Sequence, residues 1–230
     1  MQESWSLERI RAVDRIAIAD FAMPSTILME NAGRGAADWI IAHVPAHVRA
    51  AILCGVGNNG GDGLVIARHL HAAHIGVVVW MIGEPSRMTS DTATNYAILS
   101  KTSVPCRWIA MDSNDDELGS MIQDVTQADI ILDALLGTGA SGSPRGSIAT
   151  AIRVANESPA RRFAIDIPSG LDGGSGLPNT PTFRAEATLT FVASKIGFES
   201  PNALPYVGRV IVLPIGVPPE VIDRAREDHS

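Results

Sequence analysis

Two aspartates each end an apolar run of the sequence, a position where a carboxylate can do chemistry. Asp133 follows 130–132, and Asp166 follows 163–165. An ionised carboxylate among apolar neighbours is costly unless it is paired with a cation or well hydrogen-bonded. No Lys or Arg follows Asp133 before Arg145, so a salt bridge and a bound cation both stay open for this residue. If the two aspartates meet in one crevice, one can hold a cation while the other transfers a proton.

The stretch GVGNNGGDG, Gly55 to Gly63, packs five glycines into nine residues directly after the apolar run 50–54. Its spacing matches G-x-G-x-x-G, the loop that brings backbone N–H groups and a helix N-terminus to a pyrophosphate. Glu84 lies close to where this fingerprint expects an acid. Glycines continue past Gly60, however, and predict a chain that stays non-helical and a loop wider than the fingerprint's. A glycine-rich turn without a ligand is the plain alternative.

The same loop carries polar side chains that suit a polar ligand or a cation better than a bare pyrophosphate. These are the amides of Asn58 and Asn59 and the carboxylate of Asp62. For Asp62 a second interpretation stays open, because an aspartate in this place can simply cap the following helix.

Two further loops combine small and polar residues. GTGASGS, 137–143, is a second cradle with three hydroxyl groups, and a helix is predicted from about Gly146. In the third loop Pro168 has no N–H and cannot continue a central strand. Asp166 and Ser169 should therefore lie where the sheet opens, whereas Asp172 is interpreted as a turn residue.

The elements that position these loops alternate between strand and helix, which predicts parallel pairing through right-handed crossovers. Apolar residues at three-residue spacing predict a first helix over 7–20 with Ser6 as its cap, and a second helix begins near Pro24 with Ser25 or Thr26 as a cap. The predicted strands are 50–54, 76–82, 104–110, 129–134, 162–166, 188–192 and 208–213, and the later helices are about 62–74, 90–101, 116–125 and 146–156.

Several of these strands are continuous apolar runs, as expected when helices cover both faces of a sheet. The predicted fold is α/β: a doubly wound, mostly parallel sheet in a three-layer α/β/α Rossmann-like sandwich, with the last two strands extending one edge. Ligands of such sheets bind outside the carboxyl ends of the strands, where the strand order reverses.

Composition limits the possible functions. The chain has 230 residues, 46% of them hydrophobic, enough for one large core, so a single domain over 1–230 is expected. A net charge of −7 and no basic cluster beyond Arg161 and Arg162 argue against a nucleic-acid partner. Two isolated cysteines fit neither a disulfide framework nor a metal site, and no segment is long and apolar enough for a membrane span or a signal peptide. A cytoplasmic protein is the expectation.

Taken together, the loops resemble a known family. GNNGGDG, DALLGTG and DIPSGLD, in this order, are similar to the signature of the NAD(P)H-hydrate epimerases, the N-terminal YjeF family. MPSTILMENAG (Met23 to Gly33) and TLTF…SKIG (Thr188 to Gly197) resemble the flanking motifs of the same family. The resemblance spans about residues 7–216.

The resemblance implies epimerisation at the hydroxyl-bearing ring carbon of hydrated NADH or NADPH, whose S form a separate ATP- or ADP-dependent dehydratase repairs. It implies a homodimer, with the N-terminal helices as candidate interface elements. It also implies that Asp166 is the catalytic residue and that a potassium ion sits on Asn59, Asp133 and Ser169. The residues implied to contact the substrate are Asn58, Asn59, Gly60, Gly61, Asp62, Gly137, Thr138, Gly139, Ala140, Ser141, Gly142, Ser143 and Asp166.

The sequence departs from the family in one place. Some members carry a lysine after the second strand of the sheet that has been proposed to assist the counterpart of Asp166, but here that region reads MIGEPSR, 81–87. Arg87 and the later Lys195 are candidate substitutes. A non-catalytic nucleotide-binding or scaffold protein therefore stays an alternative, as does an NAD(P) oxidoreductase that uses the first loop and Glu84. Many bacterial members fuse this domain to a dehydratase domain, so the chain is either a stand-alone epimerase or part of a longer protein.

Overall fold

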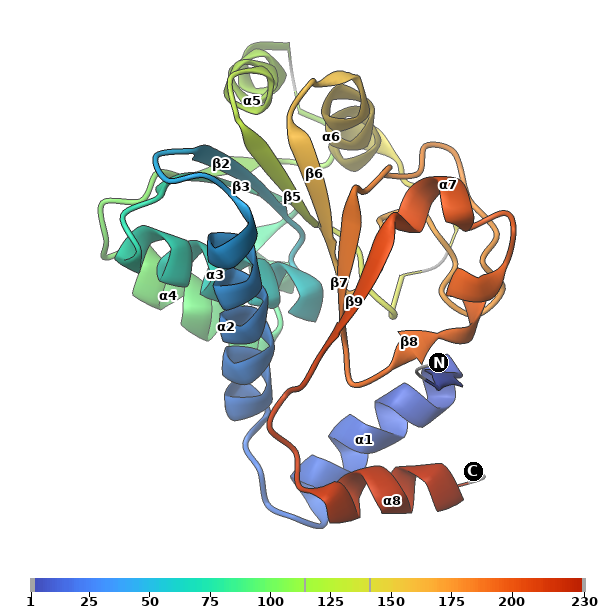
Figure 1. Cartoon of the computed structure of the whole chain (residues 1–230). Helices are drawn as coiled ribbons and strands as arrows, with labels where there is room; N and C mark the ends of the chain where they lie inside the picture. Colours follow the sequence, from blue (N-terminus) through green and yellow to red (C-terminus); the bar gives the residue numbers. More distant parts are fainter. Residues whose placement is uncertain (1–2, 114, 141, 229–230) are drawn as a thin grey trace.

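The structure is a computed structural model of the chain, and it describes residues 3–113, 115–140 and 142–228. Its centre is a seven-stranded sheet in the order β4-β3-β2-β5-β6-β7-β9, and each neighbouring pair is parallel (Figure 1). The strands of this sheet are β2 (Arg49–Cys54), β3 (Gly76–Ile82), β4 (Cys106–Ile109), β5 (Ile130–Ala134), β6 (Arg161–Ile165), β7 (Ala187–Phe191) and β9 (Arg209–Leu213). Every predicted strand is present, and the last two extend one edge as expected.

Helices cover both faces of the sheet, which confirms the three-layer sandwich (Figure 1). One face carries α2 (Ser25–His43), α3 (Asn58–Ala72) and α4 (Ser90–Leu99), and the other carries α5 (Asp115–Thr126) and α6 (Gly146–Glu157). The helices α1 (Leu7–Ala19) and α8 (Pro219–Glu227) pack side by side at the end where the chain begins and finishes (Figure 1).

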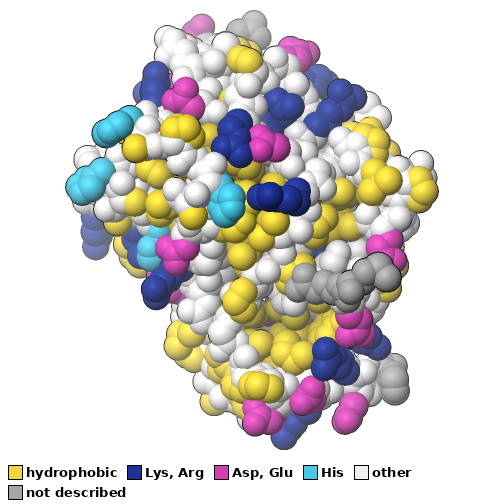
Figure 2. Space-filling view, viewed as in Figure 1, with side chains coloured by type: hydrophobic (Ala, Val, Ile, Leu, Met, Phe, Trp, Pro, Cys, Tyr) yellow, Lys and Arg dark blue, Asp and Glu magenta, His cyan; other side chains and the backbone are white. Residues whose placement is uncertain are grey.

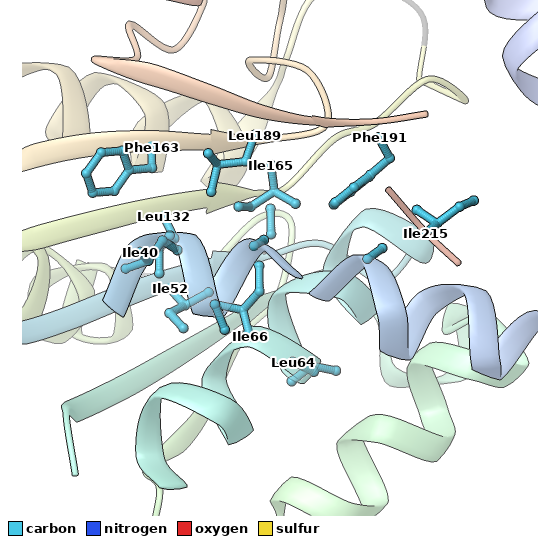
Figure 3. Packing of buried hydrophobic residues seen from close by; sticks show 14 of the residues in the cluster. Ile40, Ile52, Leu64, Ile66, Leu132, Phe163, Ile165, Leu189, Phe191 and Ile215 are labelled. Atoms are coloured by element: carbon cyan, nitrogen blue, oxygen red, sulfur yellow. The ribbon is translucent and has the colours of Figure 1, made fainter. Parts of the chain in front are cut away.

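The hydrophobic core lies between the sheet and these helices because the strands present apolar side chains to both faces. Every residue of β2 after Arg49, and every residue of β5, is buried. Figure 3 shows the larger of the two main core clusters, in which Ile40 of α2 and Ile66 of α3 lie against side chains of the sheet such as Ile52 and Leu132. The smaller cluster packs α5 and α6 against the opposite face.

The start of the chain partly follows the predicted pattern. Ser6 caps α1 as expected, since its hydroxyl accepts a hydrogen bond from the Arg9 amide at 3.2 Å. The predicted cap of α2 by Ser25 or Thr26 is wrong. Both residues lie inside the helix, and Pro24 occupies the cap position without a side-chain hydrogen bond, because its fixed φ suits a helix start.

Several short elements have no counterpart in the prediction because their periodicity is too short to detect. They are β1 (Ser4–Trp5), β8 (Ser194–Lys195), η1 (Pro85–Arg87), η2 (Ile196–Glu199) and α7 (Leu204–Val207). The helix α8 (Pro219–Glu227) also has no counterpart in the prediction. β1 and β8 form a separate parallel pair in which Trp5 lies opposite Lys195.

The strand order reverses between β2 and β5. From β2 the chain moves outward through β3 to β4 and then returns to β5 on the other side of β2. This is the switch point at which doubly wound sheets bind their ligands. The loops after β2, β5 and β6 meet there.

The distribution of charged side chains and the character of the helices bear on whether the molecule has a large charged patch or a membrane span. On the face seen in Figure 2, Lys and Arg side chains are interspersed with Asp and Glu. Among the described residues, no helix combines the length and apolar character that crossing a membrane would require.

Candidate active site

The first loop is tighter than predicted. Only Gly55 to Gly57 separate β2 from α3, which begins at Asn58 rather than at about residue 62. The prediction of a wide loop is therefore wrong, and the turn is as short as that of a dinucleotide fingerprint. The first turn of α3 places helix N–H groups, which have no partner within a helix, at the switch point.

The later glycines of this motif serve packing, which explains the error. A Cβ on Gly60 would lie 1.8 Å from the Gly55 carbonyl oxygen, and a Cβ on Gly63 would lie 2.7 Å from both the Ala134 Cβ and the Cys54 Sγ. The helix can thus lie directly on β2 and β5 only because these side chains are missing. Asp62 is the fifth residue of α3, so the interpretation of Asp62 as a helix cap is wrong; the cap position is Gly57.

Asp133 is fully buried, and its carboxylate is held by the third loop. Its Oδ1 accepts hydrogen bonds from Ser169 Oγ at 2.6 Å and the Leu135 amide at 3.2 Å, and its Oδ2 accepts one from the Ser169 amide at 2.7 Å. Among the described residues no Lys, Arg or His pairs with it, so the salt-bridge interpretation is wrong. Burial raises the pKa of Asp133 to about 6, against the lowering effect of the Ser169 bonds.

A buried side-chain oxygen beside this loop, Oδ1 of Asn59, has no hydrogen-bond partner. Asn59 is 7% exposed and donates from Nδ2 to the Leu136 carbonyl at 2.9 Å, while its Oδ1 has no hydrogen-bond partner. Ser169 Oγ accepts a hydrogen bond from the Leu136 amide at 2.9 Å, so Leu136 is hydrogen-bonded to both Asn59 and Ser169. Buried polar atoms are normally satisfied, and an orphaned carbonyl oxygen near a carboxylate and a hydroxyl suits a hard cation.

The oxygen character of this group decides which metals fit. Among the described residues no three His, Cys, Asp or Glu side chains gather in a way that could hold a metal ion. One carboxylate with amide and hydroxyl oxygens carries too little charge and softness for a transition metal. Asn59, Asp133 and Ser169 thus fit a weakly charged cation, the set that the resemblance implied.

Asp166 follows β6 directly and adopts an unusual backbone, with φ +64°. Its amide donates to the Leu189 carbonyl of β7 at 2.8 Å. Its Oδ1 accepts a hydrogen bond from Lys195 Nζ at 2.5 Å. The other oxygen, Oδ2, points toward the second loop, 3.8 Å from where a Cβ on Gly137 would lie. A left-handed aspartate at a crevice is the kind of strained residue found at functional sites.

The charge of Asp166 acts on two more carboxyl groups, those of Asp14 and Asp62. Desolvation raises the pKa of Asp62 well above its usual value, and it raises the pKa of Asp14 to about 6. In both cases the charge of Asp166 raises the pKa further and that of Lys195 lowers it. Asp14, Asp62, Asp166 and Lys195 are called the acidic cluster below.

The second loop lies against α1. Arg11 donates to the Thr138 carbonyl at 2.6 Å, and the Ala140 amide bonds back to the Gly137 carbonyl at 3.1 Å. Ser143 Oγ bonds Asn179 at 3.4 Å, whereas Gly139 and Gly142 have open space around them. A small pocket opens here, lined by residues of 136–142, 167–172 and Asn179. Ser141 lies outside the described residues.

The structure brings most of the predicted residues together. Asn58 to Asp62, the Gly137 loop, Asp133, Asp166 and Ser169 all lie at the carboxyl ends of β2, β5 and β6. Glu84 and Arg87 do not join them, since they are exposed at the start and end of the turn after β3. Asp172 is a turn residue as predicted, accepting hydrogen bonds from the amides of Gly174 and Ser175.

The sequence interpretation missed Arg11 and Asp14 entirely. They lie on the polar side of an amphipathic helix, a position that normally faces water. A spacing of three residues does put them on one face of α1, but no local signal connects that face with loops more than a hundred residues away.

Comparison with known families decides between the interpretations. The sequence model of the family described as YjeF-related protein N-terminus matches residues 25–197. The chain belongs to this family. The chain is also 41% identical over 215 residues to an NAD(P)H-hydrate epimerase of Rhodopirellula baltica, covering 94% of this chain and 85% of the relative. It is 39% identical over 223 residues to one of Pirellula staleyi, covering 97% and 96%.

Two further matches are a longer relative, of which the chain covers only part, and a solved structure. A bifunctional NAD(P)H-hydrate repair enzyme Nnr of Pyrobaculum aerophilum is 40% identical over 201 residues, which cover 86% of this chain but 39% of that enzyme. The crystal structure of the yeast protein ynu0 superposes with a TM-score of 0.81 at 19% identity, covering 97% of this chain and 93% of that one. This structure shares the fold.

Proposed function

We propose that this protein is an isomerase that interconverts the R and S forms of hydrated NADH and NADPH. The proposal is carried by one observation: in a chain that aligns almost end to end with relatives named NAD(P)H-hydrate epimerase, Asp166 Oδ2 faces the small-residue loop at the switch point. The oxidoreductase alternative explains less. An oxidoreductase would leave Asp133, Asp166 and Ser169 without a task, and Glu84 is exposed.

In the proposed reaction Asp166 is the acid–base residue. Its carboxylate accepts the proton of the ring hydroxyl while the bond between the hydroxyl-bearing carbon and the ring nitrogen breaks, so that this carbon becomes a planar carbonyl carbon and the electron pair stays on the nitrogen. The nitrogen then adds to the opposite face of the carbonyl carbon, and Asp166 returns the proton to the oxygen. The reaction therefore has no net redox change and needs no external reductant. A positioned general acid–base group contributes about 10²- to 10⁴-fold to such a rate.

The substrate is proposed to lie across the mouths of β2, β5 and β6, with its phosphates on backbone N–H groups. Two segments support this placement, because each combines small residues with a helix start nearby. The proposed contacts are Asn58, Asn59, Gly60, Gly61, Asp62, Asp166 and the residues of 137–143.

A potassium ion is proposed to bind Asn59, Asp133 and Ser169. The unpartnered Asn59 Oδ1 and the buried Asp133 support this proposal, since both lack a positive partner among the described residues. When bound, the ion supplies positive charge at the carboxyl ends of β2 and β5. The protein's own part is to hold these oxygens in place through the Ser169 and Leu136 hydrogen bonds.

The functional partner is proposed to be a dehydratase that consumes the S form. Relatives named bifunctional NAD(P)H-hydrate repair enzyme support this, because the region matched here makes up 39% of one of them. We also propose that residues 1–230 form one YjeF N-terminal domain, supported by a family match within one continuous sheet. A homodimer and a cytoplasmic location stay predictions.

The direct test mixes the purified protein with R-enriched hydrate and follows R/S interconversion by chromatography. The expected result is approach to the same R/S ratio from either epimer, at a rate proportional to protein concentration. Binding of the hydrate without interconversion would overturn the proposal in favour of a non-catalytic nucleotide-binding protein.

A further inference from the structure

We propose that Lys195 is a positioning residue for Asp166: its ammonium group fixes Oδ1 and thereby keeps Oδ2 directed at the substrate. The inference rests on the proposed function of Asp166. Lys195 stands in none of the three loops, and it comes from β8, 29 residues further along the chain.

The hydrogen bonds of Lys195 account for its whole ammonium group. The side chain is 0% exposed, and Nζ donates to Asp166 Oδ1 at 2.5 Å, to Thr190 Oγ1, and to the Phe191 carbonyl at 3.5 Å. An ammonium group has three donors, and each has an acceptor here. A fully buried and fully satisfied ammonium group cannot rotate toward a second partner without losing a bond, so it holds the Asp166 carboxylate in one orientation.

The backbone of Asp166 is hydrogen-bonded to β7, the strand that also holds Thr190 and Phe191. Its amide bonds the Leu189 carbonyl, and its side chain reaches Thr190 through Lys195, so two consecutive residues of β7 anchor it. The left-handed backbone of Asp166 needs such anchoring, since an L-residue rarely adopts this conformation unless the surroundings impose it. Oδ2 is the oxygen that these anchors leave facing Gly137.

Lys195 is itself positioned by the start of the chain. β8 pairs with β1, and the partner of Lys195 in that pair is Trp5, which is 3% exposed. The aligned pair of two-residue strands fixes the backbone of Lys195 outside the hydrogen-bonded ladder of the main sheet. The small sheet thus has a task in the active site.

The charge of Lys195 acts on the rest of the acidic cluster. The positive charge of Lys195 lowers the pKa of Asp14 and of Asp62, against the raising effect of the Asp166 charge on both. A neutral replacement would remove this compensation.

The chain contains two lysines, which makes the test selective. Lys101 is exposed at the end of α4 and serves as the matched control. Lys195→Met is expected to lower kcat by about 10²-fold, while KM stays within a few-fold of the wild-type value. It is also expected to move the acid limb of the kcat–pH profile to higher pH. Lys195→Arg should restore part of the rate, and Lys101→Met should change neither quantity. Combining Lys195→Met with Asp166→Asn should cost little beyond Asp166→Asn alone.

A second measurement does not depend on activity and covers the case in which Lys195→Met fails to fold. In protein labelled with ¹⁵N-lysine, Asp166→Asn should shift the Nζ resonance of Lys195 and leave that of Lys101 unchanged. Two results would overturn the inference: a Lys195 resonance insensitive to Asp166→Asn, or a folded Lys195→Met variant with wild-type kcat and pH profile. If the wild-type protein shows no epimerisation, the proposed function fails while the resonance shift still tests the contact.

Discussion

At the scale of single residues, the roles proposed for the two strand-end aspartates differ because their surroundings differ. Asp133 is sealed in the core and hydrogen-bonded by Ser169, whereas Asp166 is paired with Lys195 and keeps one oxygen toward the loop at Gly137. The first is suited to hold a cation and the second to move a proton. Each role predicts a different loss on mutation.

Asp166→Asn is expected to lower kcat for epimerisation by about 10²- to 10⁴-fold, or roughly 3–5 kcal/mol of barrier, because the amide cannot transfer the proton. Affinity for the hydrate should change much less, since shape and most hydrogen bonding are kept. Chromatographic rates and calorimetric binding measure the two effects. Asp38→Asn on an exposed face of α2 is the control, and near-wild-type turnover of Asp166→Asn would move attention to Asp62 or Lys195.

Asp133→Asn is expected to abolish binding of the monovalent cation. In wild-type crystals exchanged into rubidium, anomalous scattering should give one peak near Asp133, Asn59 and Ser169. Potassium at about 100 times its dissociation constant should stabilise the wild type by about 2.7 kcal/mol relative to choline chloride. The variant should show neither effect. A lysine or arginine head group at the place of the peak would refute the site.

Asp14→Asn is expected to change how stability depends on pH. The pKa of Asp14 in the folded protein is about 6, above its usual 3.8, so the folded state binds more protons than the unfolded state between these values. The contribution of Asp14 to the free energy of unfolding therefore falls as pH rises from about 4 through 6. Urea unfolding at a series of pH values should show a smaller decline in the variant. An unchanged decline would contradict the raised pKa of Asp14 in the folded protein.

At the scale of elements, α3 shows how a helix can be built from residues that normally break one. Gly60, Gly61 and Gly63 cost helix propensity, up to about 1 kcal/mol each relative to alanine. They are kept because Cβ atoms would collide with Gly55, with Met29 of α2, and with Ala134 and Cys54. Close packing on β2 and β5 outweighs propensity.

Gly60→Ala is therefore expected to destabilise the protein by about 3 kcal/mol or more, despite the better helix propensity of alanine. Gly119→Ala is the matched control: Gly119 lies in α5 with nothing within 4 Å of a Cβ, and its replacement should stabilise by up to about 1 kcal/mol. Urea denaturation measures both. A Gly60→Ala variant as stable as the wild type would show that α3 can shift away from β2.

At the scale of the whole molecule, every residue assigned to the site comes from the carboxyl edge of the sheet or from elements folded onto it. Adding the S hydrate should therefore slow amide hydrogen exchange in 55–61, 136–140 and 166–170, with no change in the turns at 44–48 and 73–75 on the opposite edge. Mass spectrometry of peptides covers all these segments. Protection confined to the amino-terminal edge would refute the proposed orientation of the substrate.

Much of the fold was predictable because it depends on local pattern. Continuous apolar runs specified strands buried on both sides, and alternation with helices specified parallel pairing, so β3 begins and ends where expected. The aspartates after β5 and β6 could be placed at one edge for the same reason. The start of α3 could not be predicted in this way. Its glycines are needed because Cβ atoms there would collide with Gly55 and with β5, which are not neighbours within the helix.

The sequence by itself determined the order of elements, the edge of the sheet that carries chemistry, and the three motifs of the family. Only the tertiary structure decided which side chains complete the site. Lys195 reaches Asp166 while β8 pairs with β1, and Arg11 bonds the Thr138 carbonyl because α1 lies against the second loop. Contacts between segments so far apart leave no periodicity in either one, and they exist only once the whole core has assembled.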